Sequence, residues 1–157
     1  MTDHPTALKP GATAPDFTLP AGPDKKISLR DFRGRTVVLA FYPADFSPVC
    51  SAQLSEYTRQ APDLQRRNAQ LIGISVDGAW CHAAFAKERG LAFPLLSDSE
   101  PKGAVARQYG VYREQNGISE RALFVIDGDG VIRWSYVSPI GENPGAGGML
   151  RALDALK

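Results

Sequence analysis

The sequence predicts an α/β fold in which a mixed central β-sheet is flanked by helices. Two near-continuous apolar runs, residues 36–42 (TVVLAFY) and 69–77 (AQLIGISVD), are typical of strands that are buried on both faces of a sheet. Between them, apolar residues recur every three or four positions over 48–67, which favours a helix and therefore a parallel strand pair with a right-handed crossover. Residues 121–127 and 131–137 flank the turn signal Gly-Asp-Gly, so we expect a hairpin that makes the sheet mixed.

Five prolines interrupt the first two dozen residues: Pro5, Pro10, Pro15, Pro20 and Pro23. Because proline fixes φ and donates no backbone hydrogen bond, we expect this stretch to be an extended arm that runs over the surface. Residues 26–35 (KISLRDFRGR) then predict a short strand and a turn.

Three further helices complete the predicted elements. Residues 79–90 form a short helical pattern closed by Gly90, and residues 101–110 end in the same way. A last helix follows the glycine-rich stretch 141–148 and runs to Lys157. This order of elements fits a thioredoxin-like α/β sandwich with an N-terminal extension. Without repeats or a long linker, the chain is expected to be one domain, residues 1–157.

Composition excludes several classes of function. The formal net charge is +1 and the basic residues are scattered, so nothing indicates a nucleic-acid or membrane surface. The N-terminus has no apolar signal segment, and no run is long enough to span a membrane, so a cytoplasmic location is expected. Two cysteines cannot form a multi-bridge framework. In a reducing compartment each thiol is either buried and inert or reactive.

Cys50 is the main candidate for chemistry. It follows the loop after the strand 36–42 and falls in the first turn of the next helix, where free backbone N–H groups and the helix dipole favour a thiolate. Ser47, three residues earlier, offers a hydroxyl that can accept or donate, and Pro43 can wall off the thiol without competing for hydrogen bonds. The alternative is a buried structural cysteine beside an ordinary serine cap.

The spacing Pro43-x-x-x-Ser47-x-x-Cys50 resembles the Pro-x-x-x-(Thr/Ser)-x-x-Cys signature of the peroxiredoxins, thiol-dependent peroxidases built on the thioredoxin fold. The resemblance extends along nearly the whole chain. GATAPDFTLP resembles the family's opening strand region, ISVD its second central strand, and RALFVID the segment that bears its active-site arginine. The branches it most resembles are bacterioferritin comigratory protein (peroxiredoxin Q) and the one-cysteine AhpE-like proteins.

The resemblance implies a role for each matching residue. Cys50 would be the peroxidatic nucleophile that becomes a sulfenic acid. Ser47 would orient the peroxide, Pro43 would shield the sulfur, and Arg121 would hold the thiolate and stabilise charge as the O–O bond breaks. Gln53 would help to hold the arginine. Without the resemblance, Arg121 would be read as a member of a weak surface ion pair.

The resemblance also requires a step that returns the sulfenic acid to a thiol. One branch places a resolving cysteine five positions later, which is Ser55 here, and another places it near the C-terminus, but no cysteine follows Cys81. Some peroxiredoxin Q-like members place it on the helix that here carries Cys81, so Cys81 is the candidate for an intramolecular disulfide. Alternatively, Cys81 only packs in the core beside Phe85, and an external thiol reduces the sulfenic acid of Cys50.

The expected substrates are hydrogen peroxide and small organic hydroperoxides. The reductant would be a thioredoxin-like protein or a low-molecular-weight thiol, and the protein a monomer or homodimer. No cofactor or metal is expected, because two cysteines and two histidines lack ligand spacing. His82 is interpreted as a surface residue or as making local hydrogen bonds.

Two other functions compete with the peroxidase interpretation. A disulfide oxidoreductase needs Cys-x-x-Cys, but Ser47 occupies the attacking position. A non-catalytic binding or holdase module would not need Cys50 at all.

Overall fold

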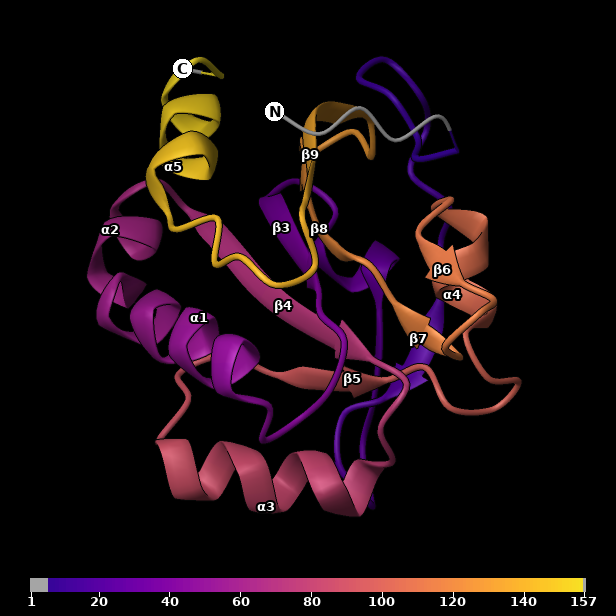
Figure 1. The fold of residues 1–157 in the computed structure, drawn as a ribbon. Coiled ribbons are helices and arrows are strands. Elements are labelled where there is room, and N and C mark those ends of the chain that lie inside the picture. The colour runs from indigo at the N-terminus through magenta and orange to yellow at the C-terminus, as the bar shows by residue number, and fades with distance from the viewer. Residues whose placement is uncertain (1–5, 157) are drawn as a thin grey trace.

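The computed structural model describes residues 6–156, and a five-stranded sheet with the order β5-β4-β3-β8-β9 lies at its centre (Figure 1). Its strands are β3 (Thr36–Phe41), β4 (Ala69–Ser75), β5 (Leu95–Ser97), β8 (Arg121–Ile126) and β9 (Ile132–Ser138). β3, β4 and β5 run parallel, whereas β8 is antiparallel to both β3 and β9. The predicted parallel pair, the hairpin and the mixed α/β sheet are therefore confirmed.

The pairing of β3 with β8 brings distant parts of the chain together. Phe41, the last residue of β3, pairs with Ala122 near the start of β8, and Val37 pairs with Ile126 at the other end. The loop that leaves β3 and the residue that opens β8 consequently lie at the same edge of the sheet.

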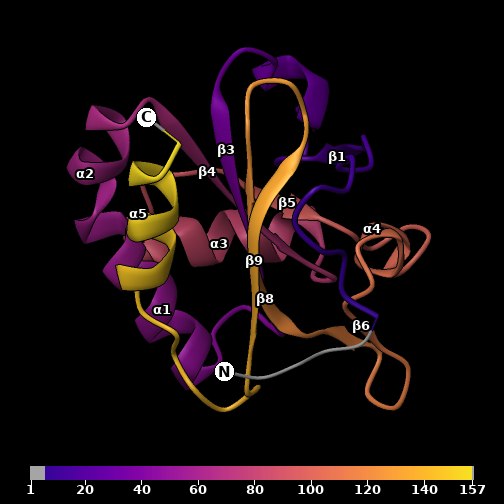
Figure 2. The ribbon, with the colours of Figure 1, turned by 90° about the horizontal axis from the view of Figure 1, so that it is seen from above.

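Helices cover one face of the sheet. They are α1 (Pro48–Arg59), α2 (Ala61–Arg66) and α5 (Gly147–Asp154), while α3 (Ala79–Arg89) contacts the edge strand β5. Figure 2 shows α1, α2 and α5 on one side of the sheet and α4 (Ala104–Gln108) with β1 (Thr18–Pro20) on the other. Side chains of β8 alternate between these faces, as a pleated strand requires. Leu123 and Val125 pack with the helices, and Phe124 packs with the opposite cluster.

The other face is covered by α4 (Ala104–Gln108) and by the N-terminal segment. That segment forms a small hairpin, β1 (Thr18–Pro20) with β2 (Lys26–Ser28), followed by the 3₁₀ helix η1 (Leu29–Phe32). The expectation of a surface-running arm was wrong for its apolar residues. Ala14, Phe17 and Leu19 are buried, because this face has little helical cover and the arm supplies it.

The predicted helix 48–67 is divided into α1 and α2 at Gln60. Pro62 explains the division, since its ring clashes with a carbonyl one turn earlier and it lacks an N–H. Gly103 has a φ of 72°, so α4 begins after it and is shorter than predicted. α5 ends at Asp154, and the predicted end at Lys157 lies outside the described residues, as does Pro5.

Three short strands were not predicted. They are β5 and the small hairpin of β6 (Tyr112–Arg113) with β7 (Ile118–Ser119). With two or three residues each, they are too short to show a periodic pattern.

Candidate active site

Cys50 lies in the first turn of α1, after the cap residue Ser47 and the proline Pro48. Proline suits this position because the first N–H groups of a helix have no partner within the helix. The backbone of the preceding loop is constrained, since Phe46 has a φ of 66°, in the left-handed region. Cys50 has no exposed surface, and its thiol is free. A thiolate at this position is stabilised by the helix dipole.

Arg121 opens β8 and reaches Cys50 across the sheet edge. Its Nη1 donates to the Cys50 Sγ at 3.2 Å and to the Gln53 Oε1 at 2.8 Å. Its Nε and Nη2 donate to the carbonyl of Ile140 at 3.0 and 2.8 Å. Only 3% of Arg121 is exposed, so this guanidinium is a fixed cation beside the sulfur rather than a surface charge.

Gln53 is held in turn by Tyr57, one turn further along α1. The Gln53 Nε2 donates to the Tyr57 hydroxyl at 3.1 Å, and that hydroxyl donates to the carbonyl of Gly145 at 3.0 Å. Gln53 and Tyr57 are both fully buried. The sequence resemblance named Gln53 but not Tyr57, whose position in a helical pattern indicated only a core residue.

Ser47 and Pro43 lie on the loop that leads to Cys50. Pro43 is buried, and the Ser47 hydroxyl is buried without a hydrogen-bond partner in the part of the chain that the structure describes. It does not cap α1. A buried hydroxyl without a hydrogen-bond partner costs about 1–3 kcal/mol. A substrate oxygen that accepted a hydrogen bond from Ser47 would remove this cost.

The same loop is held on its other side by a buried polar cluster that sequence reasoning missed. The Asp45 carboxylate accepts from the Tyr42 hydroxyl at 2.6 Å and lies 2.7 Å from the His82 Nδ1, while the His82 Nε2 lies 3.0 Å from the carbonyl of Leu96. The surface interpretation of His82 is corrected, because this residue is only 2% exposed. The packing of α3 beside the loop brings His82 to a partner 37 positions away, which no local pattern reveals.

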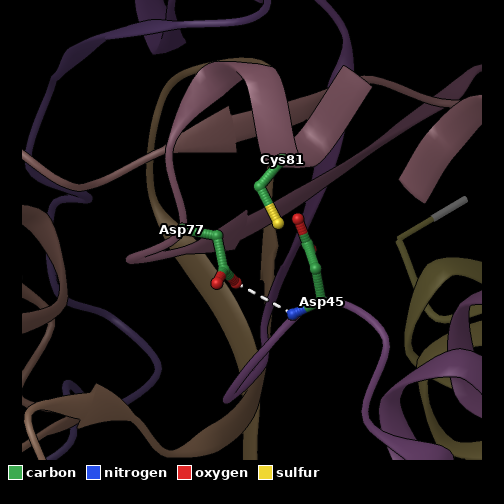
Figure 3. Close-up of side chains that lie close together, drawn as sticks. All are labelled: Asp45, Asp77 and Cys81. Carbon is green, nitrogen blue, oxygen red and sulfur yellow. Dashed lines mark hydrogen bonds between the residues drawn. The ribbon is translucent and has the colours of Figure 1, made fainter. Parts of the chain in front are cut away.

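Cys81 belongs to this cluster rather than to the contacts around Cys50. Figure 3 shows its sulfur directed at the Asp45 carboxylate, with Asp77 nearby and bonded to the Asp45 amide at 2.8 Å. Burial, the hydrogen bond to Asp45 and the negative charges of Asp45 and Asp77 raise the pKa of Cys81 to about 11. Its neutral thiol is therefore favoured in this conformation.

Potential ligand atoms of Asp45, Asp77 and Cys81 lie within 4.8 Å of one another. Their carboxylates are already engaged, since Asp77 also accepts from Ser75 at 2.6 Å and Asp45 accepts from Tyr42. Both oxygens of the Asp45 carboxylate and one oxygen of the Asp77 carboxylate have hydrogen-bond partners. The group accordingly serves as the hydrogen-bonded anchor of the loop.

A cavity of about 550 Å³ lies between β9 and α5, lined in part by Leu123, Tyr136 and Met149. Gly145, but neither Cys50 nor Arg121, is among the residues that line it.

Comparisons with known proteins identify the family of this chain. Residues 10–135, which include every candidate side chain described above up to Arg121, match the AhpC/TSA family. The chain belongs to this family, the peroxiredoxins. It is a thiol-dependent peroxidase with the thioredoxin-like fold, and its family reduces peroxides with thiol reductants.

Individual relatives cover most of the chain. Alkyl hydroperoxide reductase E of Mycobacterium tuberculosis is 40% identical over 136 residues, 86% of this chain and 89% of that protein. Peroxiredoxin-1 of Gallus gallus is 40% identical over 146 residues, 85% of this chain and 72% of that protein. The crystal structure of peroxidoxin BcpB from Mycobacterium tuberculosis has a TM-score of 0.86 and 33% identity, covering 96% of this chain and 99% of the other.

None of the helices among residues 6–156 has the length and apolar character needed to cross a membrane.

Proposed function

We propose that Cys50 is the peroxidatic cysteine and that Arg121 is the cation that holds its thiolate. The observation that carries this proposal is the contact of 3.2 Å between the Arg121 Nη1 and the Cys50 Sγ at the start of α1. A buried cation and a helix N-terminus act together on one sulfur, and both favour its ionised form. A structural cysteine would need neither of them.

The remaining side chains fit the steps of peroxide reduction. The Cys50 thiolate attacks one peroxide oxygen, so that an S–O bond forms and the O–O bond breaks. The product is a sulfenic acid, and the departing alkoxide or hydroxide takes a proton to become an alcohol or water. Arg121 stabilises the charge on the departing oxygen, Ser47 donates a hydrogen bond to the peroxide, and Pro43 excludes water from one side. Because Cys50 has no exposed surface, the loop 43–47 must move to admit the peroxide.

Cys81 is the candidate that resolves the sulfenic acid within the chain. Its thiolate would attack the Cys50 sulfur, so that a disulfide forms and water leaves. The ring centroids of Phe46 and Phe85 lie 4.9 Å apart, which supports a close approach of α3 to the loop before Cys50. Two thiols of a reductant would then return both cysteines to the reduced state.

A one-cysteine cycle is the second candidate, and the environment of Cys81 favours it. The pKa of about 11 leaves little thiolate at neutral pH, and Asp45 holds the thiol. An external thiol would then attack the sulfenic acid of Cys50. In the two-cysteine cycle, Cys81 must leave Asp45 before it can act as a nucleophile.

The proposed substrates are hydrogen peroxide and small organic hydroperoxides, and the proposed reductant is a thioredoxin-like protein or a low-molecular-weight thiol. We further propose a monomer or homodimer that acts as one domain in the cytoplasm, where such reductants keep thiols reduced. Two hydrophobic clusters on opposite faces of one sheet support the single domain.

The reduced protein is treated with one equivalent of hydrogen peroxide and a dimedone trap, and its intact mass is measured. This experiment tests both the role of Cys50 and the choice between the two cycles. A dimedone adduct on Cys50 with Cys81 free establishes the one-cysteine cycle. Loss of two hydrogens, with both cysteines in one linked peptide, establishes the intramolecular disulfide. If wild-type Cys50 stays unmodified, or if Cys50→Ser retains peroxidase activity, the assignment of Cys50 is wrong.

A further inference from the structure

A chain of hydrogen bonds leads from Gly145 through Tyr57, Gln53 and Arg121 to Cys50. In each of these bonds, the donor and the acceptor are defined by the chemistry of the groups. The Tyr57 hydroxyl donates to the Gly145 carbonyl and accepts from the Gln53 amide nitrogen. The Gln53 amide oxygen accepts from Arg121, which also donates to the Cys50 sulfur. Among residues 6–156, Tyr57 and Arg121 are the hydrogen-bond partners of the Gln53 side chain.

The orientation of the Gln53 amide is critical because its two ends have opposite hydrogen-bonding properties. Its oxygen only accepts and its NH₂ only donates, whereas the guanidinium of Arg121 only donates. If the amide turned over, the NH₂ group would face the guanidinium and the hydrogen bond at 2.8 Å would be lost. Arg121 would then lose one of its fixed acceptors beside the sulfur.

The Tyr57 hydroxyl excludes the reversed amide. The Gly145 carbonyl can only accept, so the single hydroxyl proton points at Gly145 and the Tyr57 oxygen presents its lone pairs to Gln53. That arrangement needs the NH₂ end of Gln53 at Tyr57 and the oxygen end at Arg121. Burial raises the pKa of Tyr57 well above its usual range, so the hydroxyl keeps its proton.

We propose that Tyr57 is a positioning residue for peroxide reduction, because its hydroxyl sets the direction of the Gln53 amide and thereby the place of Arg121 beside Cys50. The inference rests on the proposed role of Cys50.

Tyr57→Phe tests the proposal, because it removes the hydroxyl and keeps the ring in the core. Tyr109→Phe is the matched control: Tyr109 is equally buried and its hydroxyl donates to the Pro15 carbonyl at 2.7 Å, on the opposite face of the sheet. The readout is the second-order rate constant for oxidation of Cys50 by hydrogen peroxide, followed across pH by competition with horseradish peroxidase. We expect Tyr57→Phe to lower this constant about 10-fold, the value of one hydrogen bond of about 1.4 kcal/mol, and to move the midpoint of the pH–rate profile to higher pH. Tyr109→Phe should change neither.

A second background separates amide orientation from loss of packing. In Gln53→Glu both side-chain oxygens accept, so turning the group over leaves an acceptor at Arg121. Adding Tyr57→Phe to this background should lower the rate constant by less than about 2-fold, relative to Gln53→Glu alone. Equal losses in the two backgrounds, or no loss in the single variant, would overturn the proposal. A wild-type Cys50 that fails to react with peroxide would instead refute the proposed function, so the two failures are distinguishable.

Discussion

Arg121 donates from Nη1 to the sulfur of Cys50 at 3.2 Å, although 71 positions separate the two residues in the chain. The same nitrogen also donates to Gln53, and the other two donor nitrogens both reach the Ile140 carbonyl. The planar fork of the guanidinium is what allows one side chain to hold three partners at once.

Arg121→Lys is therefore expected to be damaging even though it keeps the positive charge. An ammonium on a flexible stem cannot reach Cys50, Gln53 and Ile140 together. We expect the rate constant for oxidation by hydrogen peroxide to fall about 100-fold, as when one fixed donor is removed from an oxyanion site. Stopped-flow competition kinetics measures it. Arg133→Lys is the control, because Arg133 is half exposed and pairs with Asp127 on the surface. Comparable losses in both variants would contradict the role of Arg121.

Ser47→Ala is expected to slow catalysis without lowering stability. The Ser47 hydroxyl is buried without a partner among the described residues, so its removal breaks no hydrogen bond of the resting protein. We expect a rate constant about 10-fold lower and a melting temperature equal to or above that of wild type, because the substitution removes a buried hydroxyl that has no partner. Ser51→Ala is a close control, since the Ser51 hydroxyl is equally buried and has no partner within residues 6–156, but it has no proposed role. If both variants react with peroxide at the wild-type rate, Ser47 does not orient the substrate.

Cys81 is expected to react slowly with alkylating agents at neutral pH. Its pKa of about 11, against an ordinary 9.0, lowers the thiolate fraction at pH 8 about 100-fold. Alkylation by iodoacetamide, followed by peptide mass spectrometry, should keep accelerating as pH rises from 9 towards 11. Since the unfolded chain ionises first, the stability contributed by this thiol is complete below pH 9 and is lost as pH rises through about 11.

Asp45→Asn supplies the variant for that measurement, because it removes one of the negative charges that raise the pKa of Cys81. Alkylation of Cys81 in the folded protein should accelerate, whereas the exposed change Asp24→Asn should have no effect. Equal rates in Asp45→Asn and wild type would leave burial and the charge of Asp77 as the causes of the slow reaction.

The sequence predicted the elements that have strong local patterns. β3, β4 and the β8–β9 hairpin are apolar runs with clear turn signals, and their positions are confirmed within two residues. The division between α1 and α2 was missed although Pro62 was visible, because the apolar repeat continues across it. β5 has three residues and gives no periodic signal of its own.

The candidate site was predictable only in part, for a different reason. Cys50, Ser47 and Pro43 are close in sequence, and their spacing carried the resemblance to the peroxiredoxins. The pairs Asp45–His82 and Tyr57–Gly145 join segments that are far apart in the chain, and tertiary packing alone makes them neighbours. The environment of Cys81 could not be predicted for the same reason, since Asp45 lies in a different segment of the chain.

The pairing of Phe41 with Ala122 fixes which face of the sheet receives the side chain of Arg121. Successive side chains of a strand point to opposite faces, so a shift of one residue would turn this arginine away from α1. The enzyme can therefore tolerate many substitutions along β8 that keep its apolar character, but not the loss or gain of a single residue there. The length of this strand therefore decides whether Arg121 can reach Cys50 as much as the identity of the residue that begins it.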